Sequence, residues 1–181
     1  GRVDLALSRS FLSAAENARV PAGAHLVADL NYHGTHVAAT VASNAYIGAG
    51  ITSDVTLVGL KVCAPGTPSN GFRGTCPTSG TLAAILYAAD NGLHVINLSL
   101  GGGYSRVIES ALKYAYDHDV TVVAASGNDG LEELSYPASS KYVISVGGTN
   151  RIDLVSDYSN YGKGLDLVAP GTDIPSIMPD G

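Results

Sequence analysis

The feature that most constrains the fold is an alternation of short β-branched runs with longer helical segments. Four runs are typical of strands that are mostly buried on both faces: 55–62, 95–100, 120–125 and 142–146. Apolar spacing predicts helices over 34–43, 81–91 and 105–118. This order of strands and helices favours right-handed crossovers. We therefore expect an α/β fold with a doubly wound, mostly parallel sheet and helices on both faces.

Composition favours one compact domain over residues 1–181, because 45% of the residues are hydrophobic and only 14% are charged. Ten Lys and Arg against sixteen Asp and Glu give a net charge of −6, which argues against a nucleic-acid partner. No run approaches the roughly 18 apolar residues of a membrane span, so we expect no membrane partner. The start, Gly1-Arg2-Val3-Asp4, has no initiator Met and no signal segment, and we expect that a preceding segment has been removed.

Two cysteines, Cys63 and Cys76, enclose a segment rich in Pro, Gly, Ser and Thr. A disulfide between them would close a loop of about 14 residues and contribute about 3 kcal/mol. The alternative is a pair of reduced thiols in a cytosolic protein. Cysteines that flank an otherwise unsupported loop suit an oxidising compartment, so we predict the disulfide.

The carboxyl ends of two predicted strands carry the most specific motifs, and such ends are where parallel sheets collect their functional residues. The run 95–100 continues into three glycines, and 120–125 continues into Ser126-Gly127-Asn128-Asp129-Gly130. Neither is a phosphate loop, because no glycine-rich segment ends in Gly-Lys-Ser/Thr. Asn128 is either a turn residue that tolerates a left-handed backbone or an amide donor held for a developing oxyanion.

His33 begins a helix of small apolar residues. The helix dipole disfavours a charged imidazolium in the first turn, so a neutral His33 could accept a proton. His36 lies about one turn further on, and such a pair could in isolation bind a metal. No third ligand with zinc-like spacing follows, so we predict no metal site.

Taken together, these segments resemble the central part of the catalytic domain of the subtilisin-like serine proteases, the subtilases. His33–Ala38 resembles the segment that carries the family's catalytic histidine. Residues 95–102 resemble the strand and turn that line the pocket for the residue before the scissile bond, and 124–128 the segment that ends in the oxyanion-hole asparagine. The stretches 135–138, 143–147 and 167–171 also follow the family pattern. Ala39 departs from it, since the family usually has Gly there.

The resemblance implies a serine endopeptidase with an Asp/His/Ser triad in that chain order. His33 would be the general base and Asn128 the oxyanion donor. Nothing before His33 matches the family's Asp segment, since Asp29 is expected to brace its loop. The family's Ser segment would lie beyond Gly181, and no serine within the chain fits a nucleophile turn; those considered are Ser99, Ser126 and Ser176.

Residues 1–181 are therefore expected to form a partial, incomplete subtilisin-like peptidase domain that is inactive alone. Its expected partners are the missing parts of its own domain and a protein or peptide substrate in extended conformation. The resemblance implies a set of substrate-binding residues at the two strand ends and on an opposite rim: Ser99, Leu100, Gly101, Ala125, Ser126 and Gly127, with Gly74 and Thr75 on the rim.

The implied chemistry requires no cofactor. Family members often bind a structural calcium ion after the histidine helix, but the connection 44–50 is short and has no carboxylate, so we do not predict that site. The resemblance and the cysteine pair together predict a secreted or extracellular protein. Two other functions stay open: a catalytically inactive homologue that binds peptides, and an unrelated doubly wound domain that binds a small ligand.

Overall fold

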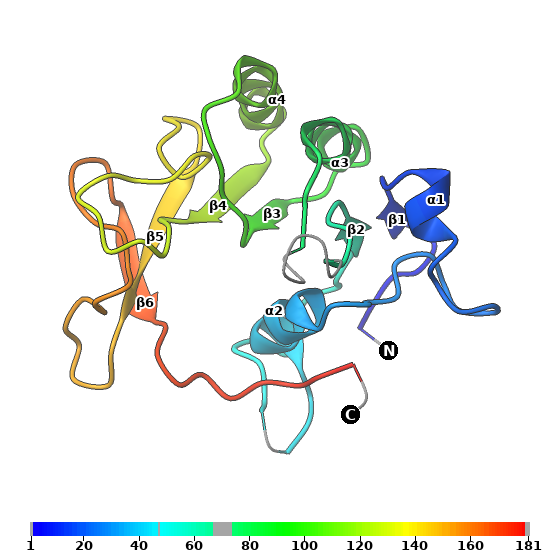
Figure 1. Ribbon diagram of the computed structural model, residues 1–181, viewed down its shortest axis with the longest axis horizontal. Helices are drawn as coiled ribbons and strands as arrows, with labels where there is room; N and C mark the ends of the chain where they lie inside the picture. Colours follow the sequence, from blue (N-terminus) through cyan, green and yellow to red (C-terminus); the bar gives the residue numbers. More distant parts are fainter. Residues whose placement is uncertain (1, 47, 67–73, 180–181) are drawn as a thin grey trace. The chain divides into compact units, whose positions relative to one another are not determined.

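The computed structural model describes residues 2–46, 48–66 and 74–179, which form two compact units (Figure 1). Unit 1 comprises Gly1–Ala84 and Pro175–Gly181, and unit 2 comprises Ile85–Ile174. The elements follow one another in this order: β1 (Arg9–Ser10), α1 (Ala14–Asn17), α2 (His33–Ala42), β2 (Leu60–Lys61), α3 (Thr78–Asp90), β3 (Val95–Leu98), α4 (Arg106–Asp117), β4 (Thr121–Ala125), β5 (Ile144–Thr149) and β6 (Leu167–Pro170).

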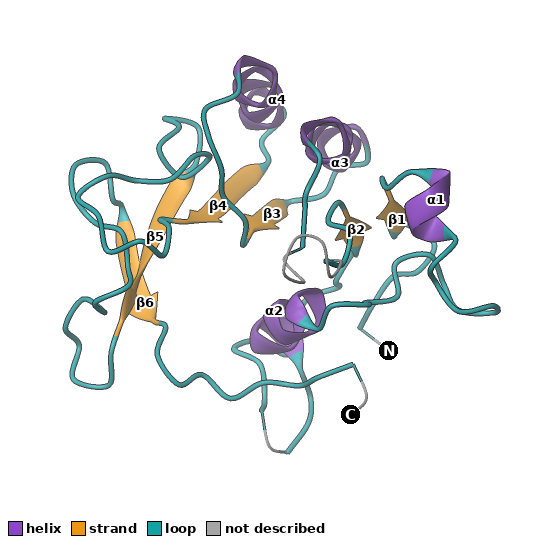
Figure 2. Cartoon of the chain, in the orientation of Figure 1, coloured by secondary structure: helices purple, strands orange, loops and turns teal. Residues whose placement is uncertain are grey.

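Unit 2 is built on a parallel sheet with the strand order β3-β4-β5-β6 (Figure 2). Val95 of β3 lies opposite Thr121 of β4, and Ala125 lies opposite Val146 of β5. Because neighbouring strands run in the same direction, the carboxyl ends of β3 and β4 lie side by side at one edge. The predicted α/β fold with a parallel sheet is confirmed.

Helix α4 shows why the sequence pattern in unit 2 was informative. Its apolar residues recur at intervals of three and four, and the structure buries four of them, Ile108, Ala111, Leu112 and Ala115. Val107, expected on the same face, is exposed. The helix packs against β4, whose Val122 and Ala124 are also buried. The predicted helix over 105–118 is confirmed to within one residue at each end.

Burial along the strands differs from the expectation of strands buried on both faces. In β3, Ile96 and Leu98 are buried, whereas Val95 and Asn97 are exposed. Strand β5 alternates in the same way, and all four residues of β6 are exposed. Strands β3, β4 and β5 thus contribute mainly one face to the core, so the prediction of burial on both faces was wrong for these three strands.

Unit 1 holds only a short parallel pair, β1 with β2, in place of the predicted strand over 55–62. The ladder is interrupted because the N–H of Gly59 donates to the hydroxyl of buried Ser8 at 2.9 Å. An isolated bridge between Val3 and Leu57 is the remaining pairing in the part of that run that the structure describes. The prediction of a long strand was wrong because the partner segment turns at residues 5–7, between the Val3–Leu57 bridge and β1, so the ladder is not continuous.

The start and the end of helix α3 are set by residues with low helix propensity. Helix α3 begins three residues before the predicted 81, since the carbonyl of Pro77 accepts the N–H of Thr81 at 3.1 Å. A Cβ atom on Gly80, in the first turn of α3, would lie 3.0 Å from the carbonyl oxygen of Phe11. This close approach explains the glycine there. The end at Gly92, with φ of +65°, is as predicted.

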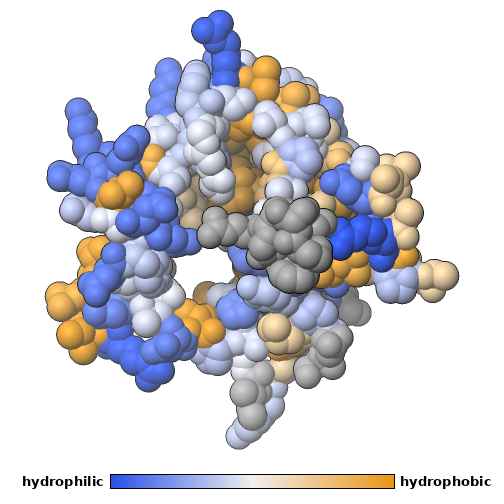
Figure 3. All heavy atoms as spheres, in the orientation of Figure 1, coloured by the Kyte–Doolittle hydropathy of each residue, from blue (hydrophilic) through white to orange (hydrophobic). Residues whose placement is uncertain are grey.

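Apolar side chains are exposed beside the edge strand β6 of unit 2 (Figure 3). Each member of this group is more than half exposed: Ile152, Leu154, Leu167 and Val168. Such a surface normally contacts other protein. Among the residues that the structure describes, no helix has both the length and the apolar character needed to cross a membrane.

We predict that Leu112→Ala lowers the free energy of unfolding by about 2–5 kcal/mol, because Leu112 is fully buried and its truncation leaves a cavity. Val107→Ala on the exposed side of the same helix is the matched control and should cost less than about 0.5 kcal/mol. Urea unfolding of both variants measures the difference. Equal effects of the two substitutions would show that α4 does not pack as described.

Candidate active site

The loop that follows β4 begins with a buried serine. Ser126 is 2% exposed, and its N–H donates to the carbonyl of Val146 in β5 at 2.9 Å. Its hydroxyl donates to the carbonyl of Asn160 at 2.9 Å. These bonds hold the first loop residue against the sheet, so the residues after it project from the strand end.

Asn160 holds the rest of this loop. Its carbonyl oxygen Oδ1 accepts the N–H groups of Asp129 at 2.8 Å and Leu131 at 3.3 Å, and its Nδ2 donates to the hydroxyl of Ser135 at 3.4 Å. Its backbone N–H donates to the carbonyl of Gly127 at 3.0 Å. Asn160 is 2% exposed, so these bonds form out of water and fix the loop. Sequence reasoning missed Asn160, since nothing in a single sequence links it to a loop thirty residues earlier.

Gly127 is required by the same arrangement. Its φ is +117°, and a Cβ atom there would collide with the side chains of Asn160 and Ser135. The motif glycine is therefore explained by a close approach as well as by a turn.

Asn128 comes next and is exposed, and its side chain makes no hydrogen bond within the described parts of the chain. A carboxamide on a fixed loop with unused donors can serve a ligand. The turn-residue alternative receives no support from the backbone, because Asn128 is not among the residues with positive φ.

The end of β3 lies beside this loop. Ladder pairing of β3 with β4 stops at Leu98 and Ala124, and Gly102 already pairs with Tyr136 through an N–H to carbonyl bond of 2.8 Å. Ser99 and Leu100 are half-buried and Gly101 is exposed. The structure thus brings two predicted groups together at one sheet edge: Ser99, Leu100 and Gly101 with Ala125, Ser126 and Gly127.

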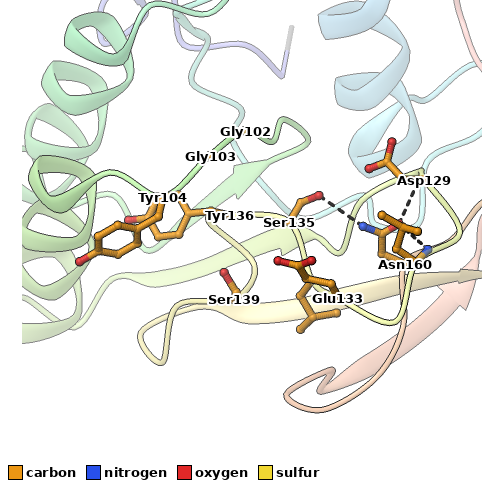
Figure 4. Close-up of a pocket in the computed structure, with 11 residues that line it drawn as sticks. Gly102, Gly103, Tyr104, Asp129, Glu133, Ser135, Tyr136, Ser139 and Asn160 are labelled. Carbon is orange, nitrogen blue, oxygen red and sulfur yellow. Dashed lines mark hydrogen bonds between the residues drawn. The ribbon is translucent and has the colours of Figure 1, made fainter.

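A cavity of about 260 Å³ opens at this edge (Figure 4). Its walls come from the segment after β3, from the loop after β4 and from the segment around Ser135. Ser135 lies close to both strand ends, since a Cβ atom on Gly101 would be 3.5 Å from the Ser135 Cβ. The Ser135 N–H donates to the carbonyl of Ser126 at 2.8 Å.

Tyr136 anchors one wall of this cavity. Its hydroxyl lies 3.2 Å from Oε2 of Glu109 in α4 and 3.3 Å from the carbonyl of Ser105. Burial and the neighbouring Glu109 carboxylate raise the pKa of Tyr136 far above its ordinary value, so the phenol stays a neutral donor. The ring of Tyr104 meets it edge to face, with centroids 5.3 Å apart.

In unit 1, His33 lies in the first turn of α2, as predicted, and is exposed. The cap of this helix is Asp29. Its Oδ1 accepts the N–H groups of Asn31 at 2.8 Å and Tyr32 at 3.0 Å, while its Oδ2 accepts the N–H and the hydroxyl of Thr35, both at 2.7 Å. Tyr32 at the helix start has φ of +78° and makes no side-chain cap.

The Asp29 carboxylate is stabilised in its charged form. Partial burial acts to raise its pKa, but the hydrogen bonds from Asn31, Thr35 and Tyr32 outweigh burial, and the pKa lies below the ordinary value of 3.8. Nearby, Lys61 of β2 donates from Nζ to the carbonyl of Ala28 at 2.7 Å. Asp29 thus braces the loop before His33, as the sequence indicated.

The serines considered as nucleophiles are engaged or buried. The Ser176 hydroxyl donates to the carbonyl of His36 at 2.7 Å, and the Ser99 hydroxyl accepts from the side chain of Asn97 at 2.9 Å. Ser126 is buried, as described above. None of the three faces solvent as a free hydroxyl at a helix start.

Cys63 and Cys76 form a disulfide, which excludes the alternative of two reduced thiols. Beside it, the backbones of Ala64 and Thr75 pair through two hydrogen bonds of 2.8 and 3.1 Å. The predicted rim residues Gly74 and Thr75 therefore belong to unit 1, and both are exposed.

No group of three or more His, Cys, Asp or Glu side chains that could hold a metal is found among the described residues. Ile47, within the connection considered for calcium, lies outside them.

A sequence profile described as the Subtilase family matches residues 8–179. The chain belongs to the subtilase family. It is 49% identical to the cell wall-associated protease of Bacillus subtilis (strain 168), over all of this chain and 19% of that protein. It is 44% identical to the thermophilic serine proteinase of Bacillus sp. (strain AK1), over 83% of this chain and 37% of that protein. The chain thus spans well under half the length of these relatives.

Solved structures agree with this assignment. A crystal structure of a cold adapted subtilisin-like serine proteinase superposes with a TM-score of 0.77 and 32% identity, over 96% of this chain and 59% of that one. This subtilase chain therefore has the fold expected of its family.

We predict that Asp29→Ala lowers the free energy of unfolding by about 1 kcal/mol at pH 7, because it removes the cap of α2. The lowered pKa means that the Asp29 carboxylate stabilises the folded state above the ordinary pKa of 3.8. This contribution is lost as the pH falls through the folded-state value, so wild type and variant should converge at acid pH.

Denaturant titrations between pH 7 and pH 3 measure this convergence. Asp54→Ala removes an exposed carboxylate of the same unit and should change the free energy of unfolding by less than about 0.5 kcal/mol. A difference between wild type and Asp29→Ala that stays constant with pH would contradict the role of the charge.

Proposed function

We propose that the protein containing this chain is a serine endopeptidase in which His33 is the general base and Asn128 donates a hydrogen bond to the oxyanion. The observation that carries the proposal is the Asn128 side chain, exposed and unpaired on a loop held by buried Asn160 and Ser126. Membership of the subtilase family supports peptide bonds as the substrate class.

The proposed reaction is acyl transfer followed by hydrolysis. A serine hydroxyl attacks the peptide carbonyl while His33 takes its proton, and the C–N bond then breaks as His33 passes that proton to the leaving amine. Water then attacks the carbonyl of the acyl-enzyme while His33 takes a proton from it. The ester bond breaks as His33 returns that proton to the serine oxygen, and the carboxylic acid is released. Asn128 acts on the carbonyl oxygen when negative charge develops there.

The serine and the aspartate that orients His33 are proposed to come from other parts of the same domain. The contacts of Asp29, Ser99 and Ser176 support this, since each is engaged within its own unit. The chemistry requires no cofactor.

An extended substrate is proposed to bind along residues 99–101. The backbone there lies beyond the last β3–β4 pair, at Leu98 and Ala124, so it can pair with a peptide strand. Ala125 and Gly127 and, from unit 1, Gly74 and Thr75 complete the proposed contacts, while buried Ser126 positions the segment Ala125–Gly127. An extracellular location is part of the proposal, and the disulfide supports it.

We predict that Asn128→Ala in the full-length protein lowers kcat by about 10²–10³ with KM nearly unchanged, since the amide stabilises the transition state more than the bound substrate. The magnitude is the one measured for the corresponding donor of a subtilisin. Initial-rate kinetics on a peptide substrate provide both constants.

Asn128→Gly is the companion variant, because glycine keeps any turn but has no amide. It should lose as much kcat as Asn128→Ala. Near-normal kcat in both variants would remove Asn128 from the mechanism, whereas loss in Ala alone would indicate a turn residue.

We further predict that residues 1–181 expressed alone hydrolyse casein no faster than background, because the family's Asp and Ser segments have no match in this sequence and the serines considered, Ser99, Ser126 and Ser176, are engaged. The full-length protein under the same conditions is the positive control. Turnover by the isolated chain that disappears in its His33→Ala variant would contradict an incomplete site.

A further inference from the structure

The cavity at the edge of unit 2 has a distinct chemical character, which concerns the substrate class of the proposed peptidase. Figure 4 shows Tyr104 and Tyr136 on one side, Asp129 and Asn160 on the other, and Glu133 between them. Leu131 and Leu134 also line it. Aromatic rings and aliphatic side chains therefore surround a space into which two carboxylates are set.

The two carboxylates are available to a ligand. Asp129 and Glu133 are exposed, and neither belongs to an ion pair among the described residues, where Asp117 and Asp173 are the paired acids. Among the described residues that line the cavity there is no Lys, Arg or His. Its field is therefore negative, and the chain as a whole carries a net charge of −6.

Ser135 and Tyr136 also line the cavity, and both are uncharged polar side chains. The Ser135 hydroxyl accepts from Asn160 Nδ2 and can still donate to a ligand. Tyr136 stays neutral because burial and Glu109 raise its pKa. A negatively charged side chain entering this space would meet two like charges, and none of the described lining residues is a cation that could compensate it.

We propose that this cavity receives the side chain of the substrate residue before the scissile bond and selects lysine or arginine there. This inference rests on the proposed peptidase function. The aliphatic stem of either side chain packs against Leu131, Leu134 and the ring of Tyr104, and its charged head reaches Asp129 and Glu133. Tyr104 is 70% exposed, so its ring face can also meet a cation.

Position along the chain supports the same assignment. Asp129 directly follows Asn128, and Gly102 and Tyr104 follow the segment 99–101 proposed to pair with the substrate backbone. A residue whose carbonyl is held by Asn128 would therefore have its side chain beside Asp129. Glu133, four residues further along the same loop, supplies the second carboxylate.

The experiment measures kcat/KM of the full-length protein on peptides that differ only in the residue before the cleaved bond: Lys, Arg, Leu, Phe or Glu. We expect Lys and Arg peptides to exceed the Leu peptide by at least about tenfold, with the Glu peptide slowest. The double variant Asp129→Asn with Glu133→Gln should lower the ratio of kcat/KM for the Lys peptide to kcat/KM for the Leu peptide by about tenfold or more.

Glu132→Gln is the matched control. It removes one charge from the same loop, but Glu132 does not line the cavity, and its Cγ lies 3.2 Å from where a Cβ of Gly162 would be. It should leave the Lys preference within about twofold of wild type.

The outcomes separate the two proposals. Hydrolysis of Leu or Phe peptides without a Lys or Arg preference would overturn the cationic pocket and leave the peptidase standing. A preference that survives the double variant would overturn the assignment to Asp129 and Glu133. No hydrolysis of any peptide would contradict the peptidase function, and with it this inference.

Discussion

The hydrogen bonds of one buried side chain, Asn160, fix the loop on which the proposed chemistry depends. Its carboxamide holds the loop at Asp129 and Leu131 and donates to Ser135, so the loop and the segment around Ser135 share one buried polar group. A buried amide of this kind is costly unless all its partners are in place, and the network therefore specifies one loop conformation. Asn128 projects from that conformation with its own amide unused.

The parallel sheet places the segment after β3 beside this loop. Since β3 and β4 are adjacent and parallel, the segments after Leu98 and Ala124 emerge at the same edge. The segment after β3 can then pair with the substrate backbone, while the loop after β4 presents Asn128. Tyr136 forms one wall of the cavity at this edge. Donors fixed before substrate arrives do not have to reorganise during the reaction, which is why a rigid loop suits an oxyanion site.

In unit 1, the charged side chain of Asp29 fixes a loop by hydrogen bonds, as the amide of Asn160 does in unit 2. The Asp29 carboxylate accepts four hydrogen bonds around the start of α2 and so sets the backbone from which His33 projects. One of these bonds takes up a free N–H group of the first helical turn, that of Thr35. In both units, a short-range motif seen in the sequence is positioned by a polar group that the motif does not contain.

This explains which parts could be predicted. Helix α4 and the strands β3 and β4 follow from local periodicity, and the family motifs locate His33 and Asn128, but Asn160 and Ser135 are connected to that site only through folding. The strand expected over 55–62 was wrong for the related reason that a strand needs a partner, and the hydroxyl of Ser8 takes the place of a ladder carbonyl at Gly59. The strand β6 was recognised only as part of a family motif, because its four residues, Leu167–Pro170, are all apolar and give no polar/apolar alternation.

The most direct test is a crystal structure of the full-length protein with a peptide aldehyde bound covalently to its nucleophile, which places an oxygen where the oxyanion forms. The account predicts that Asn128 Nδ2 lies about 2.7–3.1 Å from that oxygen, with the Asn160 bonds to the loop unchanged. An adduct oxygen held by other donors, with Asn128 directed away from it, would contradict the central claim.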